Sequence, residues 1–236
     1  IQVVGYYGWG FYLPEASAEL GLNRAQGGIV FGLSTLVGGL VSPLVGLAIG
    51  RFGLRATMTF GFVASGVGYF SLSSAQNLLH LALGYGVLVA GTHAFATIIP
   101  TQTLASTWFV RYRARVMAVL LAAAGVLSPL IYAFHGWVLS EATWRTGWTL
   151  IAAINIVLGV IALAFVRNSP EDVGQLPDGA PDVAALEANT PKSQADDSWT
   201  AREALRGGRL MVALGLAVIA TGLGSYARVL PGLREG

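Results

Sequence analysis

His93 is the strongest candidate for site chemistry, because it lies in a long stretch with few groups that ionise, VAGTHAFATIIPTQT. If this stretch is helical, Thr97 lies on the same face four residues later and Thr101 one turn further. An imidazole in apolar surroundings needs a hydrogen-bond partner. Two interpretations stay open: His93 contacts a ligand or titrates near neutral pH, or it is hydrogen-bonded between helices. His135, closer to the end of its own apolar stretch, is expected to be solvated.

Aromatic side chains near the start of the chain form a second candidate group. Tyr6, Tyr7 and Trp9 offer rings that could bracket a small planar carboxylate while their polar tips hydrogen-bond to it. A belt of aromatic residues at a membrane surface is the alternative explanation. Three weaker candidates, which packing or hydrogen bonds between helices would also explain, are Tyr132, Asn155 and Tyr226.

Other kinds of site chemistry find little support in the sequence. The absence of cysteine excludes disulfides, thiolate metal ligands and cysteine nucleophiles. The three histidines lack metal-ligand spacing, and the sequence contains neither a phosphate-binding Gly-x-x-x-x-Gly-Lys loop nor a serine nucleophile elbow. The apolar stretches contain no aspartate or glutamate for a proton relay. We therefore expect no enzyme, no metal, no cofactor and no nucleic-acid partner.

Arginines cluster at two places between apolar stretches. Arg111, Arg113 and Arg115 occupy every second position of WFVRYRARVMAV, and Arg51 and Arg55 lie in another short connection. If the chain first runs outward from the cytoplasm, both clusters are cytoplasmic. The bases that then lie outside are Arg24, Arg145, Arg228 and Arg234, out of 14 lysines and arginines. This distribution fits the positive-inside rule.

The composition indicates that these residues belong to a membrane protein. Hydrophobic residues make up 54% of the chain, charged residues 11%, and the mean hydropathy is +0.64. Six runs are long enough to cross a bilayer as helices. The uncharged residues 1–13 are interpreted as the outer part of a further, incomplete helix, and the start has no signal-peptide pattern. The six runs are residues 28–50, 56–75, 78–107, 116–139, 146–166 and 209–226.

A polar interruption divides the chain into three parts. Residues 167–208 carry eight acidic side chains, four basic ones and four prolines, a composition that cannot form a buried core. We predict a six-helix transmembrane bundle over residues 1–166, a cytoplasmic linker over 167–208, and a seventh helix with an external tail over 209–236. Thr200 and Glu203 form a capping-box pattern for a short helix that leads into the last part.

Five stretches, in this order along the chain, resemble the major facilitator superfamily, and within it the oxalate/formate antiporter and monocarboxylate transporter-like branch. The first two are YYGWGFYLPEASAELGLNRAQ and SPLVGLAIGRFGLRATM. They are followed by WFVRYRARVMAV, RNSPEDVGQLPDG and ARVLPGLREG. The resemblance covers essentially the whole chain and implies an all-α membrane fold of which this sequence holds about seven of twelve helices. The chain is accordingly expected to be truncated.

The resemblance also implies roles for particular residues. Helices 1, 4 and 7 of the superfamily line the transport path, and Tyr7 precedes GWGF as aromatic residues do in the family. The superfamily's cytoplasmic motif Gly-x-x-x-Asp-Arg-x-Gly-x-Arg is present except that Gly50 replaces its aspartate, so its charge network must be altered here. The implied cytoplasmic gate residues are Gly46, Arg51, Gly53, Arg55, Arg111, Arg113 and Arg115.

These expectations lead to one functional hypothesis with three alternatives. We expect a secondary transporter of small organic anions, monocarboxylates or dicarboxylates, that works by alternating access. It would be a multi-pass protein of the cell membrane, namely the bacterial inner membrane. The expected substrate-binding residues are Tyr6, Tyr7, His93, Thr97 and Tyr132, and proton co-transport and antiport both stay open. The alternatives are an exporter of drugs or metabolites, a non-transporting receptor, and an inert truncated product.

Overall fold

The structure is a computed structural model that describes residues 3–182, apart from the side chains of Val3 and Ala124. The greater part of the predicted linker, the expected seventh helix and Tyr226 lie outside the described residues, and so does the capping-box pattern at Thr200. All longer elements within the described range are helices, which agrees with the predicted all-α class.

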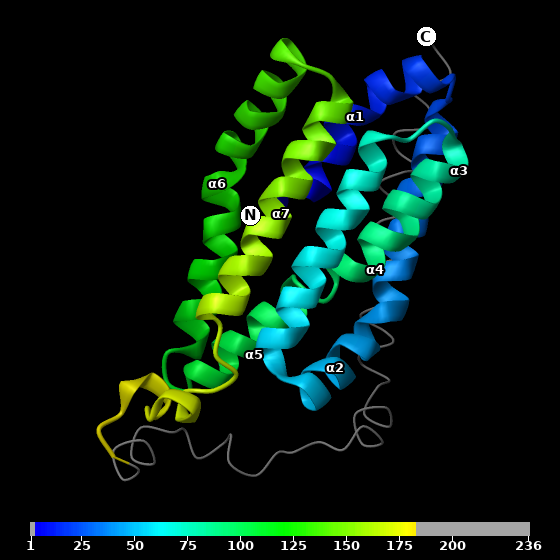
Figure 1. Cartoon of the computed structure of the whole chain (residues 1–236). Coiled ribbons are helices and arrows are strands. Elements are labelled where there is room, and N and C mark those ends of the chain that lie inside the picture. Colours follow the sequence, from blue (N-terminus) through cyan, green and yellow to red (C-terminus); the bar gives the residue numbers. More distant parts are fainter. Residues whose placement is uncertain (1–2, 183–236) are drawn as a thin grey trace, which may run out of the picture. The chain divides into compact units, whose positions relative to one another are not determined.

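Helices occupy each of the apolar stretches predicted between residues 1 and 166 (Figure 1). Two short 3-10 turns, Glu171–Val173 and Pro177–Gly179, follow the last of them. The helices are α1 (Val3–Leu20), α2 (Arg24–Ser73), α3 (Leu78–Leu81), the π-helix η1 (Ala82–Val89), α4 (Ala90–His93), α5 (Ile98–Trp108), α6 (Arg113–Glu141) and α7 (Trp144–Phe165).

The two predicted stretches 28–50 and 56–75 are the two arms of α2, which run side by side in opposite directions (Figure 1). The reversal occurs at Gly53, whose φ of 79° and ψ of 169° are not helical. A side chain would be strained at this φ, so glycine is the residue that allows the tight connection. Asn23 and Gln26 form a capping box that starts the first arm.

The predicted helix 78–107 is broken, because the chain leaves helical geometry between Ala94 and Thr97. Pro100 favours the break: within a continuous helix its ring would clash with the carbonyl of Ala96, whereas in the first turn of α5 its missing N–H is not needed. The prediction that Thr97 and Thr101 continue one helical face from His93 is therefore wrong.

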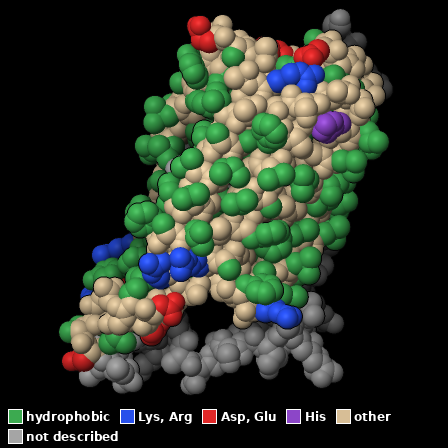
Figure 2. Space-filling view, viewed as in Figure 1, with side chains coloured by type: hydrophobic (Ala, Val, Ile, Leu, Met, Phe, Trp, Pro, Cys, Tyr) green, Lys and Arg blue, Asp and Glu red, His purple; other side chains and the backbone are tan. Residues whose placement is uncertain are grey.

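Two groups of connections lie at opposite ends of the helices in Figure 1. We call the end with residues 51–55, 109–115 and 166–182 the arginine end, and the end with residues 21–23, 74–77 and 142–143 the opposite end. The two charged ends are separated by a face on which hydrophobic side chains are spread widely (Figure 2). Four helical stretches are apolar and long enough to cross a membrane, namely α2, Leu78–Trp108, α6 and α7.

Aromatic rings fill the core between α1, α2, η1 and α7. Trp9 stacks on Tyr85 with ring centroids 4.3 Å apart, and Tyr69 stacks on Trp148 at 5.6 Å. Tyr12 is fully buried against Trp148. Trp9 and Tyr12 are therefore core residues in this structure rather than members of an exposed aromatic belt.

His135 is completely buried, so the expectation that it is solvated is wrong. Its Nε2 lies 3.0 Å from the Val4 carbonyl, which can only accept a hydrogen bond, so Nε2 carries the proton. Nδ1 then accepts from the Tyr12 hydroxyl at 2.8 Å. Both contacts tie α6 to α1, and the sequence could not show them because the partners are more than 120 residues away.

Polar contacts join α1 to α7 at the opposite end. Arg145 donates from Nη2 to Glu19 at 2.7 Å, and the Trp144 indole donates to the second carboxylate oxygen at 2.7 Å. Glu19 lies beyond the apolar run of α1. The hydrogen bonds from Arg145 and Trp144, in that order of size, hold the pKa of its carboxyl below the usual value.

Candidate functional site

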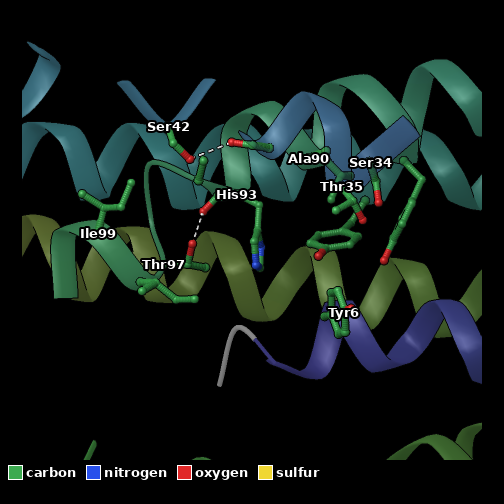
Figure 3. A pocket seen from close by; sticks show the side chains of 14 residues that line it. Tyr6, Ser34, Thr35, Ser42, Ala90, His93, Thr97 and Ile99 are labelled. Carbon is green, nitrogen blue, oxygen red and sulfur yellow. Dashed lines mark hydrogen bonds between the residues drawn. The ribbon is translucent and has the colours of Figure 1, made fainter. Parts of the chain in front are cut away.

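A cavity with a volume of about 410 Å³ lies between α1, both arms of α2, and the stretch from η1 to the start of α5 (Figure 3). It adjoins the helix break at residues 94–97, where backbone and side chains are not fixed by a regular helix. Its lining is mostly uncharged and mixes rings, hydroxyls and aliphatic groups. The polar and aromatic members are Tyr6, Ser34, Thr35, Ser42, Tyr69, Tyr85, His93 and Thr97.

His93 is the one side chain of this lining that can carry a positive charge. It ends α4 and lies directly before the break. Its Nδ1 atom is buried and, among the described residues, has no hydrogen-bond partner. A buried ring nitrogen without a partner is costly. The geometry therefore leaves an unsatisfied polar atom on a side chain that lines the cavity, and a ligand or a water molecule would reach it once the lining shifts.

The serine and threonine hydroxyls of the cavity already donate their protons to backbone carbonyls three or four residues earlier in the chain. Ser34 donates to the Phe31 carbonyl at 2.7 Å, Ser42 to the Gly38 carbonyl at 2.8 Å, and Thr97 to the His93 carbonyl at 2.9 Å; Figure 3 shows the last two. Each hydroxyl oxygen then has only lone pairs left for a ligand. In this conformation Thr97 is an acceptor, not the donor that binding of a carboxylate would require.

The predicted tyrosines form one continuous group of rings, with the Tyr6 and Tyr7 centroids 6.0 Å apart, but only one of them lines the cavity. Tyr6 lines the cavity, whereas Tyr7 and Tyr132 are not part of its lining. Their rings contact each other at 5.5 Å between centroids, and Tyr132 also contacts Phe11 at 5.5 Å. Neighbouring residues of a helix point about 100° apart. As a result, Tyr6 on α1 lines the cavity, whereas Tyr7 on the same helix packs against Tyr132.

Sequence reasoning missed the hydroxyl groups on the first arm of α2. Ser34, Thr35 and Ser42 line the cavity. Ser34 and Ser42 are eight residues apart, slightly more than two turns, so they lie on nearly the same helix face. Hydroxyl-bearing residues at this spacing inside an apolar stretch are the sequence feature that would have predicted a polar face on this helix.

The connection between the arms of α2 is tied to the residues that follow α7. Asn168 accepts from the backbone N–H of Arg55 at 3.0 Å, and the Arg55 side chain donates from Nε to the Leu163 carbonyl at 2.7 Å. A Cβ atom at Gly53 would lie 2.6 Å from the Asn168 side chain. Contacts with the end of α7 thus hold Gly53 and Arg55, whereas Gly50, which replaces the aspartate of the motif, faces open space.

The connection between α5 and α6 is held from the same segment, by Asp178. Its carboxylate accepts from the backbone N–H groups of Val110, Arg111 and Tyr112 at 3.1, 2.7 and 3.5 Å. The side chains of Arg111 and Arg115 lie over the Tyr112 ring, 5.4 and 5.7 Å from its centroid. Among the remaining residues predicted for the gate, Gly46 faces open space and Arg51 lies over the neighbouring Phe52 ring.

Comparisons with known proteins agree with this architecture. The family model described as the Major Facilitator Superfamily matches residues 1–235. The "Uncharacterized transporter ESBP6" of Saccharomyces cerevisiae is 29% identical over 65% of the chain, and the "Uncharacterized MFS-type transporter YcxA" of Bacillus subtilis is 27% identical over 68%. Human "Monocarboxylate transporter 6" is 25% identical over 75% of the chain. The matched regions span only 23%, 39% and 35% of these three relatives, respectively.

Proposed function

Because the chain belongs to the major facilitator superfamily and is an integral, multi-pass membrane protein, we propose that it forms part of a secondary transporter of small organic anions. Transport would proceed by alternating access, with the Tyr6–His93–Thr97 cavity forming one side of the substrate path. The observation that carries this proposal is the unpartnered Nδ1 atom of His93 beside a largely uncharged cavity. The printed name of the human relative, a monocarboxylate transporter, supports the same class of substrate.

The hydrogen-bonding groups of the cavity limit the ways in which an anion could bind there. Its serine and threonine oxygens offer lone pairs, so they suit a hydroxyl or a protonated carboxyl group of the substrate. A carboxylate charge would need a protonated His93 or a cation from residues beyond the described range. We propose that His93 supplies a donor to the carboxylate, and that Tyr7 and Tyr132 have a lesser role because they lie outside the cavity.

One observation favours an exporter of drugs or metabolites as the second candidate. The cavity combines acceptor oxygens with the rings of Tyr6, Tyr69 and Tyr85, a lining that also suits an aromatic cation. Uptake assays in vesicles, comparing a labelled monocarboxylate with a cationic dye, distinguish the two. Transport of the dye without the carboxylate would reject the anion proposal.

His93→Ala should weaken the binding of a small carboxylate by about tenfold or more, because a hydrogen bond to a charged group is lost. Labelled-substrate binding and uptake by the full-length protein in vesicles measure this effect. The matched control is His80→Ala, since His80 lies outside the cavity near the opposite end. Unchanged binding and uptake would make His93 a packing residue.

We further propose that the arginine end is cytoplasmic and that Arg51, Arg55, Arg111, Arg113 and Arg115 belong to the inward gate, as the positive-inside rule indicates. This chain contains no cysteine, so a single introduced cysteine is the one thiol within it. Gln76→Cys at the opposite end should react with an impermeant thiol reagent from outside intact cells. Gln175→Cys at the arginine end should react only after the membrane is opened. The reverse pattern would invert the orientation.

A further inference from the structure

A second hollow, separate from the cavity, lies between α5, α6 and α7 at the arginine end. It has a volume of about 400 Å³, and its lining includes Thr101, Trp108, Leu120, Phe165 and Arg167. The wall is almost entirely apolar, and 78% of the Phe165 surface and 39% of the Leu120 surface are exposed. The groove is therefore open at the surface of three helices, two of which are apolar enough to cross a membrane by themselves.

Trp108, one of the residues that line this apolar groove, carries an unsatisfied hydrogen-bond donor. Its Nε1 atom is buried and has no acceptor among the described residues. An indole N–H can only donate, so the missing partner must be an acceptor such as a carbonyl or phosphate oxygen. A hydrocarbon chain alone would leave this donor unsatisfied.

Arg167 places a positive charge at the end of the same groove, directly after α7. Its Nη1 donates to the carbonyls of Ala164 and Val166 at 3.0 and 3.3 Å, which holds the guanidinium close to the end of the helix. A guanidinium has five N–H donors, so further donors remain on Nη2 and Nε. An anionic group next to the apolar wall could therefore be bound without moving the arginine.

We propose that this groove binds one anionic phospholipid. An acyl chain lies against Leu120 and Phe165, an ester carbonyl or phosphate oxygen accepts from Trp108, and the headgroup phosphate contacts Arg167. A phospholipid fits because it combines, in this order along its length, the apolar chain, the acceptor and the negative charge that the groove can accommodate. Arginines near a membrane surface attract anionic lipids in general. Here the indole N–H and the guanidinium beside the apolar wall would together bind one phospholipid molecule at a defined place.

The test measures lipid that stays bound to the full-length protein after extraction from vesicles of phosphatidylglycerol and phosphatidylcholine in equal amounts. Native mass spectrometry should show that the wild-type protein retains phosphatidylglycerol preferentially. Arg167→Gln should reduce this preference about fivefold, the effect of one arginine near an anionic surface. Trp108→Phe, which keeps a ring but removes the N–H, should lower retention of both lipids.

Trp137→Phe is the matched control, since Trp137 is 59% exposed and lies near the far end of α6. A second measurement is the quenching of tryptophan fluorescence by dibrominated phosphatidylglycerol, which should be weaker in Trp108→Phe than in Trp137→Phe. Circular dichroism checks that each variant is folded. Equal retention of both lipids by the wild-type protein, or folded Trp108 and Arg167 variants that behave like the wild type in both measurements, would overturn the proposal. Either result would leave the proposed transport function untouched, because the groove is separate from the cavity.

Discussion

Gly61→Ala should lower the melting temperature of the protein and its substrate affinity together. Gly61 lies on the second arm of α2, opposite the break between α4 and α5. An added Cβ atom would lie 2.6 Å from the backbone N of Ala96 and 2.6 Å from the carbonyl carbon of Phe95. Backbone atoms cannot turn aside as a side chain can, so the helix and the broken segment must separate.

The cost of overpacking is typically about 1–3 kcal/mol, and the higher helix propensity of alanine recovers only part of it. Because Phe95 and Ala96 lie between His93 and Thr97, the same displacement should disturb the cavity. Thermal unfolding in detergent and equilibrium binding of a labelled carboxylate measure the two effects.

Gly91→Ala is the control for Gly61→Ala. Its Cβ atom would make ordinary contacts of 3.8 and 3.9 Å with the Val37 and Val41 side chains, although Gly91 is close to His93. This variant should keep the wild-type melting temperature or exceed it slightly. A wild-type melting temperature in Gly61→Ala would show that the two backbones are not held as closely as the structure places them.

The sequence was sufficient to predict the helices but not the interruptions within them. Apolar length marks a helix regardless of its surroundings, so each stretch predicted up to residue 166 is helical. Pro100 carried only a partial signal for the break, because its ring disfavours a continuous helix through Ala96, yet Pro14, Pro43 and Pro129 lie inside helices that are not interrupted there. The fold family was also predictable from short motifs, and the match over residues 1–235 confirms it.

The partners of individual side chains were not predictable, since they depend on how distant helices rotate against each other. His135 was expected in water but meets Tyr12 and Val4 from α1. Tyr6 reaches the cavity, while its neighbour Tyr7 packs against Tyr132. A rotation of α1 by one residue would exchange these roles, and periodicity in a nearly all-apolar helix does not fix that rotation.

The second large effect is expected from Asp178, whose carboxylate accepts from three consecutive backbone N–H groups between α5 and α6. Asp178→Ala should leave these groups to water and release the connection. Amide hydrogen exchange at residues 110–112 should become at least about tenfold faster, since a hydrogen bond to a charged acceptor contributes roughly 1.5–3 kcal/mol. Mass spectrometry of exchanged peptides measures this change.

Two variants separate the role of the carboxylate from that of the backbone. Asp178 has a φ of 60°, a left-handed conformation that asparagine adopts more readily than alanine. Asp178→Asn keeps one acceptor oxygen and this conformation, so its exchange rates should lie between those of the wild type and Asp178→Ala. Asp172→Ala is the control, because within residues 3–182 Asp172 accepts from Ser169 in its own turn and from no other residue. Equal exchange at residues 110–112 in all four proteins would show that Asp178 does not hold the connection.

The consequence for transport follows from the position of Asp178 relative to Asn168. Asn168 holds the connection between the arms of α2, and Asp178, ten residues later, holds the connection between α5 and α6. One short segment after α7 thus fixes both arginine-bearing connections in the conformation described. If these connections must move when the inward gate opens, Asp178→Ala should change the rate of uptake while substrate affinity stays near the wild-type value. The cavity is formed by other residues, so Asp178→Ala should act on the gate and not on the substrate site. A large loss of substrate affinity in this variant, with amide hydrogen exchange at residues 110–112 unchanged, would contradict this division.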